Sequence, residues 1–344
     1  MQISFRKIAK ISLVLVYLVI AAGAIVRMTG SGMGCPDWPK CFGYLIPPTE
    51  ASELAWEPNR SYEKGQVIIV SEALLVAKTD FKTEDTFLAD HWEPYTKHEY
   101  AIFNPWHTWI EFINRLLGAL AGLGTLVLAI ASLRFWRKRK TITVLSFLTV
   151  FAMGFQAWLG ATVVYSVLEP VKITIHMVMA LVIVALLLYI TYTTKTPRPT
   201  FRYDRQLLVL IGLAALLSMV QIVMGTQVRQ FVDHRIDVVG EIAKNLWLQD
   251  PDLWFYVHRS FSILVVLLNG YIAYRVYKGD FGYTKVFWVL GIVFLEVLSG
   301  IAMFYLDFPF ASQPLHLILA SLLFGTQFYL VLEIFNGDKS PKSL

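Results

Sequence analysis

The sequence is poor in charge and in cysteine, and both shortages narrow the class of protein. Charged residues make up 16% of the 344 residues, whereas 56% are hydrophobic. Soluble domains carry about 25% charged residues, so an ordinary soluble enzyme is excluded. Two cysteines are too few for a disulfide-rich secreted scaffold. The net charge of +5 does not indicate a nucleic-acid partner, because basic residues in membrane proteins mostly set orientation.

Long apolar segments stand where a soluble protein would have mixed sequence. A membrane-spanning helix needs about 20 predominantly apolar residues. No small-residue cleavage site follows the first segment, so we expect a retained helix and no removed signal peptide. The predicted spans are 8–28, 107–133, 142–166, 171–193, 206–228, 253–277, 284–305 and 313–335. The sequence therefore predicts an all-α integral membrane protein with eight transmembrane helices.

Basic residues gather in alternate connections between the predicted spans. They precede the first span at Arg6 and Lys7, and they follow the second from Arg134 to Lys140. The positive-inside rule makes this side cytoplasmic. We therefore expect a multi-pass protein of a bacterial cell (inner) membrane, with both termini in the cytoplasm. The outer side then holds a long loop at 29–105, in which 43–100 is expected to form a small subdomain with short strands near Val67–Val70.

The two halves of the chain resemble each other, which predicts two repeated four-helix bundles. One half is residues 1–194, which include the long outer loop, and the other is residues 195–344. Four anchors recur in the same order, at offsets of 202, 144, 140 and 140 residues. The paired anchors are Gly23 to Arg27 with Gly225 to Arg229, Asn114-Arg115 with His258-Arg259, Gln156 and Gly160 with Glu296 and Gly300, and His176 with His316. Parallel repeats are a common way to build membrane folds.

Three histidines lie inside predicted spans, four or five residues from the outer end. Ionisable groups there are costly and are candidate functional residues. His258 and His316 can face each other across the second bundle and bind the iron of a haem b through neutral imidazoles. Zinc and a simple interhelical hydrogen bond are the alternatives. In the first half His176 is the metal-ligand candidate, but its partner position holds Asn114, a poor haem ligand, so the site is either five-coordinate or closed by another residue. His107 is one candidate for that residue, although an interfacial histidine beside Trp106 and Trp109 is the favoured interpretation of it.

Charged groups beside these positions suit a haem with propionates. Repeat-related arginines, Arg27 with Arg229 and Arg115 with Arg259, lie near predicted outer span ends. Arginine binds carboxylates through two hydrogen bonds; the alternatives are snorkelling to lipid headgroups and a structural ion pair. Glu111 shares a helix face with Asn114 and is a candidate for proton transfer. The alternative for Glu111 is an ion pair with Arg115 one helical turn away.

The two cysteines are neighbours on the predicted outer, oxidising side. Cys35 and Cys41 are separated by six positions and two prolines, which suits a small disulfide loop. The disulfide is either a structural staple or a redox-active pair. The spacing differs from that of a thioredoxin-type pair.

Taken together, these motifs resemble the haem A synthase family (CtaA type). The motifs are Val26 to Gly32, the segment Cys-Pro-Asp-Trp-Pro-Lys-Cys-Phe-Gly at 35–43, Glu111 to Gly118, Thr174-Ile-His176, His258-Arg259 and Pro314-Leu-His316. They come in the family's order and cover nearly the whole chain. The resemblance implies an enzyme that oxidises the C8 methyl group of haem O to the formyl group of haem A for terminal oxidases.

The resemblance also implies roles for individual residues. Haem b would be held by His258 and His316, and the substrate haem O would lie in the N-terminal half with Glu111 and His176 as catalytic residues. The family's Glu-x-x-His-Arg motif departs here at Asn114, which places the usual second histidine ligand in doubt. Haem O synthase and a membrane electron acceptor are expected partners, and a homo-oligomer is left open. Two rival interpretations are an electron-transfer cytochrome b with two permanent haems and a membrane disulfide oxidoreductase built on Cys35 and Cys41.

Overall fold

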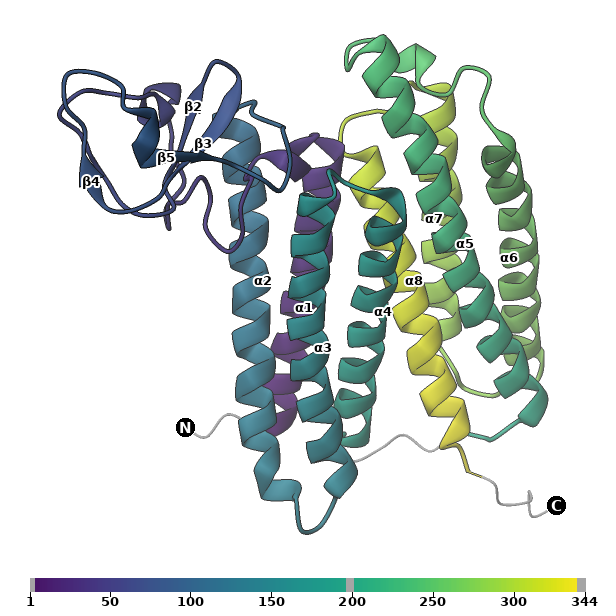
Figure 1. Ribbon diagram of the computed structural model, residues 1–344. Helices are drawn as coiled ribbons and strands as arrows, with labels where there is room; N and C mark the ends of the chain where they lie inside the picture. Colours follow the sequence, from purple (N-terminus) through teal and green to yellow (C-terminus); the bar gives the residue numbers. More distant parts are fainter. Residues whose placement is uncertain (1–3, 196–200, 339–344) are drawn as a thin grey trace. The chain divides into compact units, whose positions relative to one another are not determined.

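Eight long helices make up most of the protein (Figure 1). The computed structural model describes residues 4–195 and 201–338. The α-helices are α1 Phe5–Met28, α2 Pro105–Ser132, α3 Lys140–Tyr165, α4 Pro170–Thr193, α5 Arg205–Val239, α6 Leu253–Lys278, α7 Lys285–Tyr305 and α8 Ser312–Phe335. All eight are long and apolar enough to cross a membrane. The prediction of an all-α integral membrane protein with eight spans is therefore confirmed.

Helix α5 corrects one predicted boundary. We expected the fifth span to end at 228 and a loop to follow at 229–252, but α5 continues to Val239. Neither glycine nor proline interrupts the chain between these points, and Arg229 pairs with Asp233 one turn later at 2.7 Å. Such pairs stabilise a helix surface. The helix ends at Gly240, whose φ of 87° is readily adopted only by glycine.

Other helix ends follow from capping residues in the sequence. The side chain of Asp204 accepts a hydrogen bond from the Leu207 amide at 2.6 Å, at the start of α5. Asp252 caps α6 in the same way through the Phe255 amide at 3.2 Å. Each carboxylate satisfies one of the amides that a first helical turn leaves without a partner.

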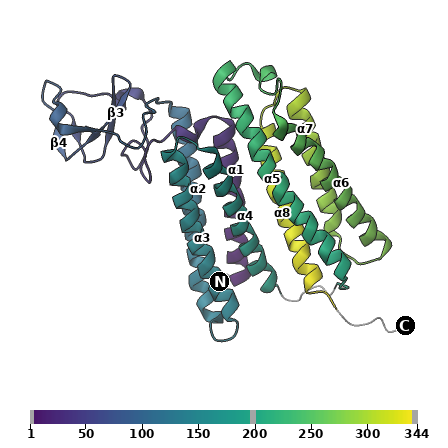
Figure 2. The same cartoon turned by 45° about the vertical axis from the view of Figure 1, so that its right-hand side comes forward.

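Helices α5 to α8 pack as a four-helix bundle. Helix α5 contacts α6 and α8, and α7 contacts the same two helices, which closes the ring. Figures 1 and 2 show these four helices side by side. Their shared apolar core includes Ile211, Ile272, Val289 and Leu330, all nearly inaccessible to solvent. This bundle supplies the helices on which the predicted pair of His258 and His316 lies.

A second buried cluster joins parts of the first four helices. It contains residues of α1, α2, α3 and α4, such as Ala9, Leu128, Ala152 and Leu187, and Phe328 of α8 packs against it. By contacts the chain divides into two compact units. The first comprises Met1–Ala21, Ala121–Met153 and Met177–Leu344, and the second comprises Ala22–Leu120 and Gly154–His176. The predicted halves at 1–194 and 195–344, and their repeat relation, stay predictions. Residues 196–200, at the start of the second half, lie outside the described residues.

The long loop carries a small β-structure, as the sequence predicted. Strand β1 Ser61–Tyr62 pairs antiparallel with β4 Phe81–Lys82. The other sheet has the order β2-β3-β5, with β2 Val67–Val70, β3 Ala73–Ala77 and β5 Trp92–Pro94, all antiparallel. Ser71 and Glu72 join β2 to β3 with positive φ at both residues, the backbone of a two-residue hairpin turn. Aromatic side chains fill the interior of this β-structure, where Trp92 contacts Tyr62 and Phe81 edge-on.

Five short 3-10 helices complete the described part of the chain. They are η1 Ser31–Met33, η2 Ala51–Leu54, η3 Ala89–His91, η4 Leu133–Phe135 and η5 Lys244–Leu246. Four lie in the connections, and η4 follows α2 directly. Helix η1 follows α1 closely and leads into the cysteine segment, so it positions that segment near the start of α2.

Candidate functional site

The bundle of α5 to α8 brings His258 and His316 together. The two rings, from α6 and α8, have centroids 6.4 Å apart and planes inclined by 68°. Imidazole nitrogen binds metals at about 2 Å, so two rings on opposite sides of one iron would have centroids about 6 Å apart. The observed spacing is compatible with that arrangement. The sequence-based pairing of these two histidines is therefore reproduced by the packing.

Polar side chains fix one of the two rings. His316 Nδ1 lies 2.8 Å from Ser299 Oγ and 3.0 Å from Glu296 Oε2, both on α7. On the other side, Gln221 of α5 donates to the His258 backbone carbonyl at 3.0 Å. His258 Nδ1 is buried and has no hydrogen-bond partner among the described residues. A buried ring nitrogen without a partner is costly, and a bound haem is one group that would offset this cost.

Haem iron fits this pair better than a bare metal ion does. Zinc sites take three or four protein ligands, whereas haem iron receives its remaining ligands from the porphyrin. Within residues 4–195 and 201–338, no group of three or more His, Cys, Asp or Glu side chains is arranged to hold a metal ion. The pair offers two imidazoles, which is the number that a six-coordinate haem needs from protein.

The first half has a related but different arrangement. Gln156 of α3 donates to the His176 backbone carbonyl on α4 at 3.0 Å, as Gln221 does for His258. His176 Nδ1 and Asn114 Oδ1 are both buried, and neither has a partner in the described part of the chain. The structure therefore places one imidazole and one amide where polar groups are unsatisfied. It does not connect His107 with them.

A glycine on a neighbouring helix faces each of the four ligand positions. A Cβ added at Gly225 would lie 3.1 Å from His258 Cε1, and one added at Gly160 would lie 3.3 Å from His176 Cε1. At Gly300 the distance to His316 Cε1 is 3.8 Å. A Cβ at Gly23 would lie 3.9 Å from Asn114 Oδ1. Glycine therefore provides clearance at Gly225 and Gly160, whereas a Cβ at Gly300 or Gly23 would make an ordinary contact. The predicted repeat pairs Gly23 with Gly225 and Gly160 with Gly300.

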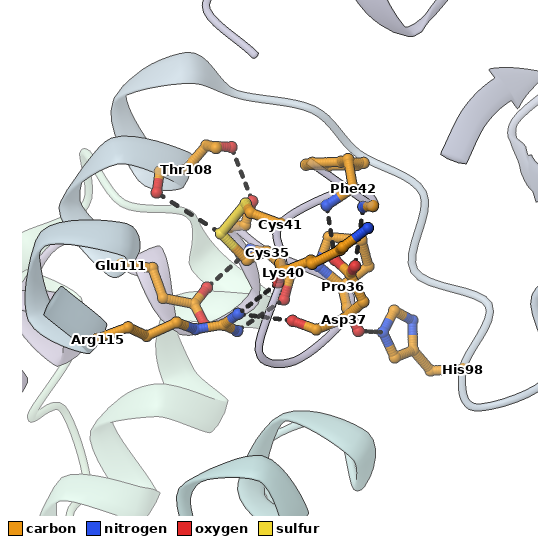
Figure 3. The surroundings of a disulfide bond; sticks show 12 residues. Cys35, Pro36, Asp37, Lys40, Cys41, Phe42, His98, Thr108, Glu111 and Arg115 are labelled. Atoms are coloured by element: carbon orange, nitrogen blue, oxygen red, sulfur yellow. Dashed lines mark hydrogen bonds and ion pairs between the residues drawn. A yellow bond between two sulfur atoms is a disulfide. The ribbon is translucent and has the colours of Figure 1, made fainter. Parts of the chain in front are cut away.

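Glu111 and Arg115 of α2 hold the cysteine segment (Figure 3). Arg115 donates to the carbonyls of Asp37 at 2.6 Å, Lys40 at 3.1 Å and Cys35 at 3.1 Å, and it also pairs with Glu111. Glu111 Oε2 accepts from the Cys35 amide at 2.8 Å. The Glu111 side chain is 5% exposed and the Arg115 side chain 13%. The ion pair considered from the sequence is therefore present, and Arg115 is committed to this loop.

The Asp37 side chain stabilises the cysteine segment through hydrogen bonds within the loop. Its carboxylate accepts from the Phe42 amide at 2.6 Å and from the Gly43 amide at 2.8 Å. Burial raises the pKa of Asp37 above its ordinary value, against the opposing hydrogen bonds from Gly43 and Phe42 and the positive charge of Arg115. At Gly43, φ is +77° and a Cβ would overlap the backbone of Gly65, so only glycine fits this turn.

The predicted disulfide between Cys35 and Cys41 is confirmed. The two cysteines are 0% and 1% exposed, and they pack against Phe42, Leu54 and other apolar side chains. Thiol–disulfide exchange requires a thiolate to reach a sulfur atom. Because the sulfurs are buried, the geometry favours the structural interpretation over the redox-active one.

The remaining arginines differ from Arg115. Arg259 is exposed, and its guanidinium lies 5.6 Å and 5.4 Å from the ring centroids of Phe255 and Tyr256. Arg229 pairs with Asp233 inside the extended part of α5. Arg27 occupies the last turn of α1, where a cation complements the helix dipole. Binding of haem propionates by any of these residues stays a prediction.

Sequence reasoning missed several residues of these sites. Gln221, Ser299 and Asp37 were not singled out, although Ser299 lies three positions after Glu296 and so on the same helix face. The four glycines were used as repeat anchors, but their clearance of the ligand positions was not recognised. The signal in the sequence is that each glycine recurs in the other half at the offset of a repeat anchor.

Comparisons with known proteins agree with these features. Residues 6–328 match the family model COX15-CtaA, described as cytochrome oxidase assembly protein. The chain is 25% identical over 348 residues to a Heme A synthase of Shewanella oneidensis, covering 92% of each chain. It is also 25% identical over 341 residues to Heme A synthases of Brucella suis and Brucella abortus, covering 91% of this chain and 85% of theirs.

Proposed function

Because the chain belongs to the COX15-CtaA family of cytochrome oxidase assembly proteins, we propose that it is a membrane-bound haem A synthase. In this proposal it oxidises the C8 methyl group of haem O to the formyl group of haem A. Relatives named Heme A synthase match it over more than nine-tenths of its length. The observation that carries the proposal is the approach of His258 and His316 within one four-helix bundle.

The second bundle would hold haem b. His258 and His316 would bind its iron, Glu296 and Ser299 would orient the His316 ring, and Gln221 would hold the His258 backbone. When bound there, haem b would supply a route for electrons leaving the substrate. Arg229 and Arg259 are the cationic side chains proposed for its propionates.

The first half would hold the substrate haem O. His176 is its proposed iron ligand, and Asn114 occupies the position where the family motif has a second histidine. An amide there leaves that side of the iron without a strong ligand. Arg27 and Arg115 are the cations proposed near its propionates, although Arg115 acts chiefly by holding the cysteine segment in place.

Glu111 would handle protons near the reacting methyl group. Oxidation of a methyl group to an aldehyde would take its oxygen atom from water and release protons, together with electrons that the membrane acceptor receives. A buried carboxylate one turn from Asn114 is placed to accept the protons. The same carboxylate binds the Cys35 amide, so its removal has a structural consequence as well. The test is Glu111→Gln, which keeps an oxygen acceptor for that amide. We expect bound haem O and an intact disulfide with little haem A formed; full aldehyde formation would remove Glu111 from the mechanism.

The proposed setting is a bacterial cell membrane with both chain termini in the cytoplasm. Haem O synthase would deliver the substrate, and an electron acceptor in the membrane would reoxidise the protein. No nucleic acid is involved, and self-association into a homo-oligomer is compatible with the chain.

Haem extraction from detergent-purified protein tests the proposal directly. We expect haem b together with haem O or haem A on chromatography, with spectra of the oxidised and reduced protein showing a six-coordinate haem b. Two molecules of haem b per chain and neither of the other haems would instead indicate an electron-transfer cytochrome. Protein without haem, after expression with ample haem supply, would contradict the proposal.

A further inference from the structure

The hydrogen bonds around His316 determine which ring nitrogen carries the proton. Ser299 Oγ lies 2.9 Å from the Glu296 backbone carbonyl and donates its hydrogen there. Toward His316 Nδ1, at 2.8 Å, the same oxygen can then only accept. The carboxylate Glu296 Oε2, at 3.0 Å from Nδ1, is an acceptor as well. With two acceptors facing it, Nδ1 must be the protonated nitrogen.

The other ring nitrogen is then left with a free lone pair. A neutral imidazole has one protonated nitrogen and one acceptor nitrogen, so protonation at Nδ1 makes Nε2 the metal-binding atom. A carboxylate that accepts from the distal nitrogen of a metal-bound histidine orients the ring and increases its basicity. Glu296 is well placed for this, since it is largely buried and one helical turn from Ser299.

The other two intramembrane histidines of the candidate sites lack this support. Among the described residues, neither His176 Nδ1 nor His258 Nδ1 has a hydrogen-bond partner. Gln156, at the position that the predicted repeat pairs with Glu296, donates to the His176 backbone carbonyl and not to the His176 ring. The carboxylate is therefore specific to one ring of the second bundle.

We propose that Glu296 and Ser299 are positioning residues that present His316 Nε2 to the iron of haem b and lower the reduction potential of that haem. This inference rests on the proposed function, because it assumes that His258 and His316 bind haem b. The physical reason is that a more basic imidazole donates more charge and favours the ferric over the ferrous state. Neither residue would touch the substrate.

The test compares Glu296→Gln and Ser299→Ala with two matched controls. Glu333→Gln removes another buried carboxylate, and Thr326→Ala removes another hydroxyl, both on the same helix as His316. Glu333 lies 17 residues from His316, which is about 25 Å along the helix. Haem b content is measured by extraction, and its midpoint potential by redox titration followed by absorbance.

We expect both site variants to raise the midpoint potential of haem b, with the larger shift in Glu296→Gln. Loss of a carboxylate behind a metal-bound histidine lowers metal affinity on the order of 10-fold, so haem b should also dissociate more readily from Glu296→Gln. The two controls should match the wild type in potential and retention. Ser299→Ala removes only one hydroxyl group, so its midpoint potential can still be measured if Glu296→Gln fails to fold.

An unchanged potential in both site variants, with haem b bound, would overturn this inference and leave the proposed function intact. Failure of the proposed function is distinguished from failure of this inference by the tautomer of His316. The tautomer is measured from 15N chemical shifts of haem-free protein labelled at histidine. Protonation at Nδ1 in the wild type, with a smaller Nδ1-protonated share in a Glu296→Ala/Ser299→Ala double variant, supports the positioning role even if the wild type binds no haem b. In that case it is the proposed function that fails. Protonation at Nε2 in the wild type would overturn the inference.

Discussion

The two predicted halves of the chain carry different side chains at the positions that the predicted repeat pairs. Where the second half has His258, the first has Asn114, and where the second has Glu296, the first has Gln156. The glycines facing these positions are present in both halves. The space for a ligand is therefore common to both, whereas the chemistry placed in that space differs.

The equivalent arginines show the same divergence. Arg115 is largely buried and binds three backbone carbonyls of the cysteine segment, whereas Arg259 is exposed and lies over aromatic rings. The first half thus uses its arginine to hold a loop that the second half does not have. This difference in the two arginines accompanies the proposal that one half binds haem b and the other the substrate haem.

The largest expected effect comes from removing a ligand of the second half. His258→Ala or His316→Ala should abolish haem b binding, because each removes one of the two proposed iron ligands. His176→Ala should leave haem b in place and reduce retention of haem O or haem A. Haem extraction from each purified variant measures this, and His234→Ala, at an exposed position of α5, is the control. Loss of haem b from His176→Ala would break the assignment of the two halves.

The comparison is sharpened by making the first half resemble the second. Asn114→His supplies an imidazole at the position equivalent to His258, and Gly23 leaves room beside it. We expect a second six-coordinate low-spin haem, visible in absorption and electron paramagnetic resonance spectra. Asn114→Gln is the matched control, because its amide is a poor haem ligand. Spectra that stay unchanged in Asn114→His would show that the substrate iron is closed by another residue.

The sequence predicted the helices better than their ends. Apolar run length identifies a span because the membrane core demands it, so all eight were found. The extension of α5 was missed because 229–239 is polar and its helix depends on local pairs such as Arg229 with Asp233. The glycine at 240 marked its end, but hydropathy does not use that signal.

The candidate site could be predicted only where a residue's position along its helix determines its neighbours. His258 and His316 were paired because both lie near the outer ends of spans in one predicted four-helix bundle, and the structure brings them together. Ser299 and Gln221 could not be assigned, because their contacts depend on how each helix is rotated in the bundle. The role of Asp37 depends on a loop backbone with a left-handed glycine at 43, which spacing alone does not determine.

The next effect concerns the two equivalent arginines. Arg115→Ala leaves Glu111 buried without its cation, and breaking a buried pair costs about 3–5 kcal/mol. Arg259→Ala removes an exposed contact with aromatic rings worth about 0.5–1 kcal/mol. Thermal unfolding of the detergent-solubilised proteins measures the loss of stability in each variant. The rate at which a reductant opens the Cys35–Cys41 disulfide measures how firmly the cysteine segment is held. Equal losses in the two variants would contradict the structural difference between these arginines.

The glycines provide a graded test of the clearance common to both halves. Gly225→Ala brings a Cβ to 3.1 Å from His258, and overpacking of this kind costs about 1–3 kcal/mol. Gly300→Ala meets His316 at 3.8 Å, an ordinary contact, and should gain part of the roughly 1 kcal/mol that alanine offers over glycine in a helix. Gly160→Ala, at 3.3 Å, should fall between them. Thermal stability of the haem-free protein is the measurement, and an order unrelated to these distances would refute the clearance role.

The smallest effect is confined to the loop that only the first half carries. Hydrogen bonds from the Thr49 backbone amide, and further bonds from Glu50 and the Thr49 hydroxyl, lower the pKa of Glu53 below its ordinary value of 4.5. A carboxyl with a lowered pKa in the folded state stabilises the fold above the unfolded value, and this contribution is lost as the pH falls through the folded pKa.

The variant Glu53→Gln isolates this contribution. It should be less stable than the wild type near neutral pH, and the difference should disappear below pH 4.5, as the pH passes the lowered pKa of Glu53. Buried Asp37 has the opposite sign, because its raised pKa means that stability falls as the pH rises above its ordinary 3.8. Thermal unfolding of both proteins across this range measures the difference. A gap between variant and wild type that is constant with pH would mean that the Glu53 carboxylate does not cap η2 through its charge.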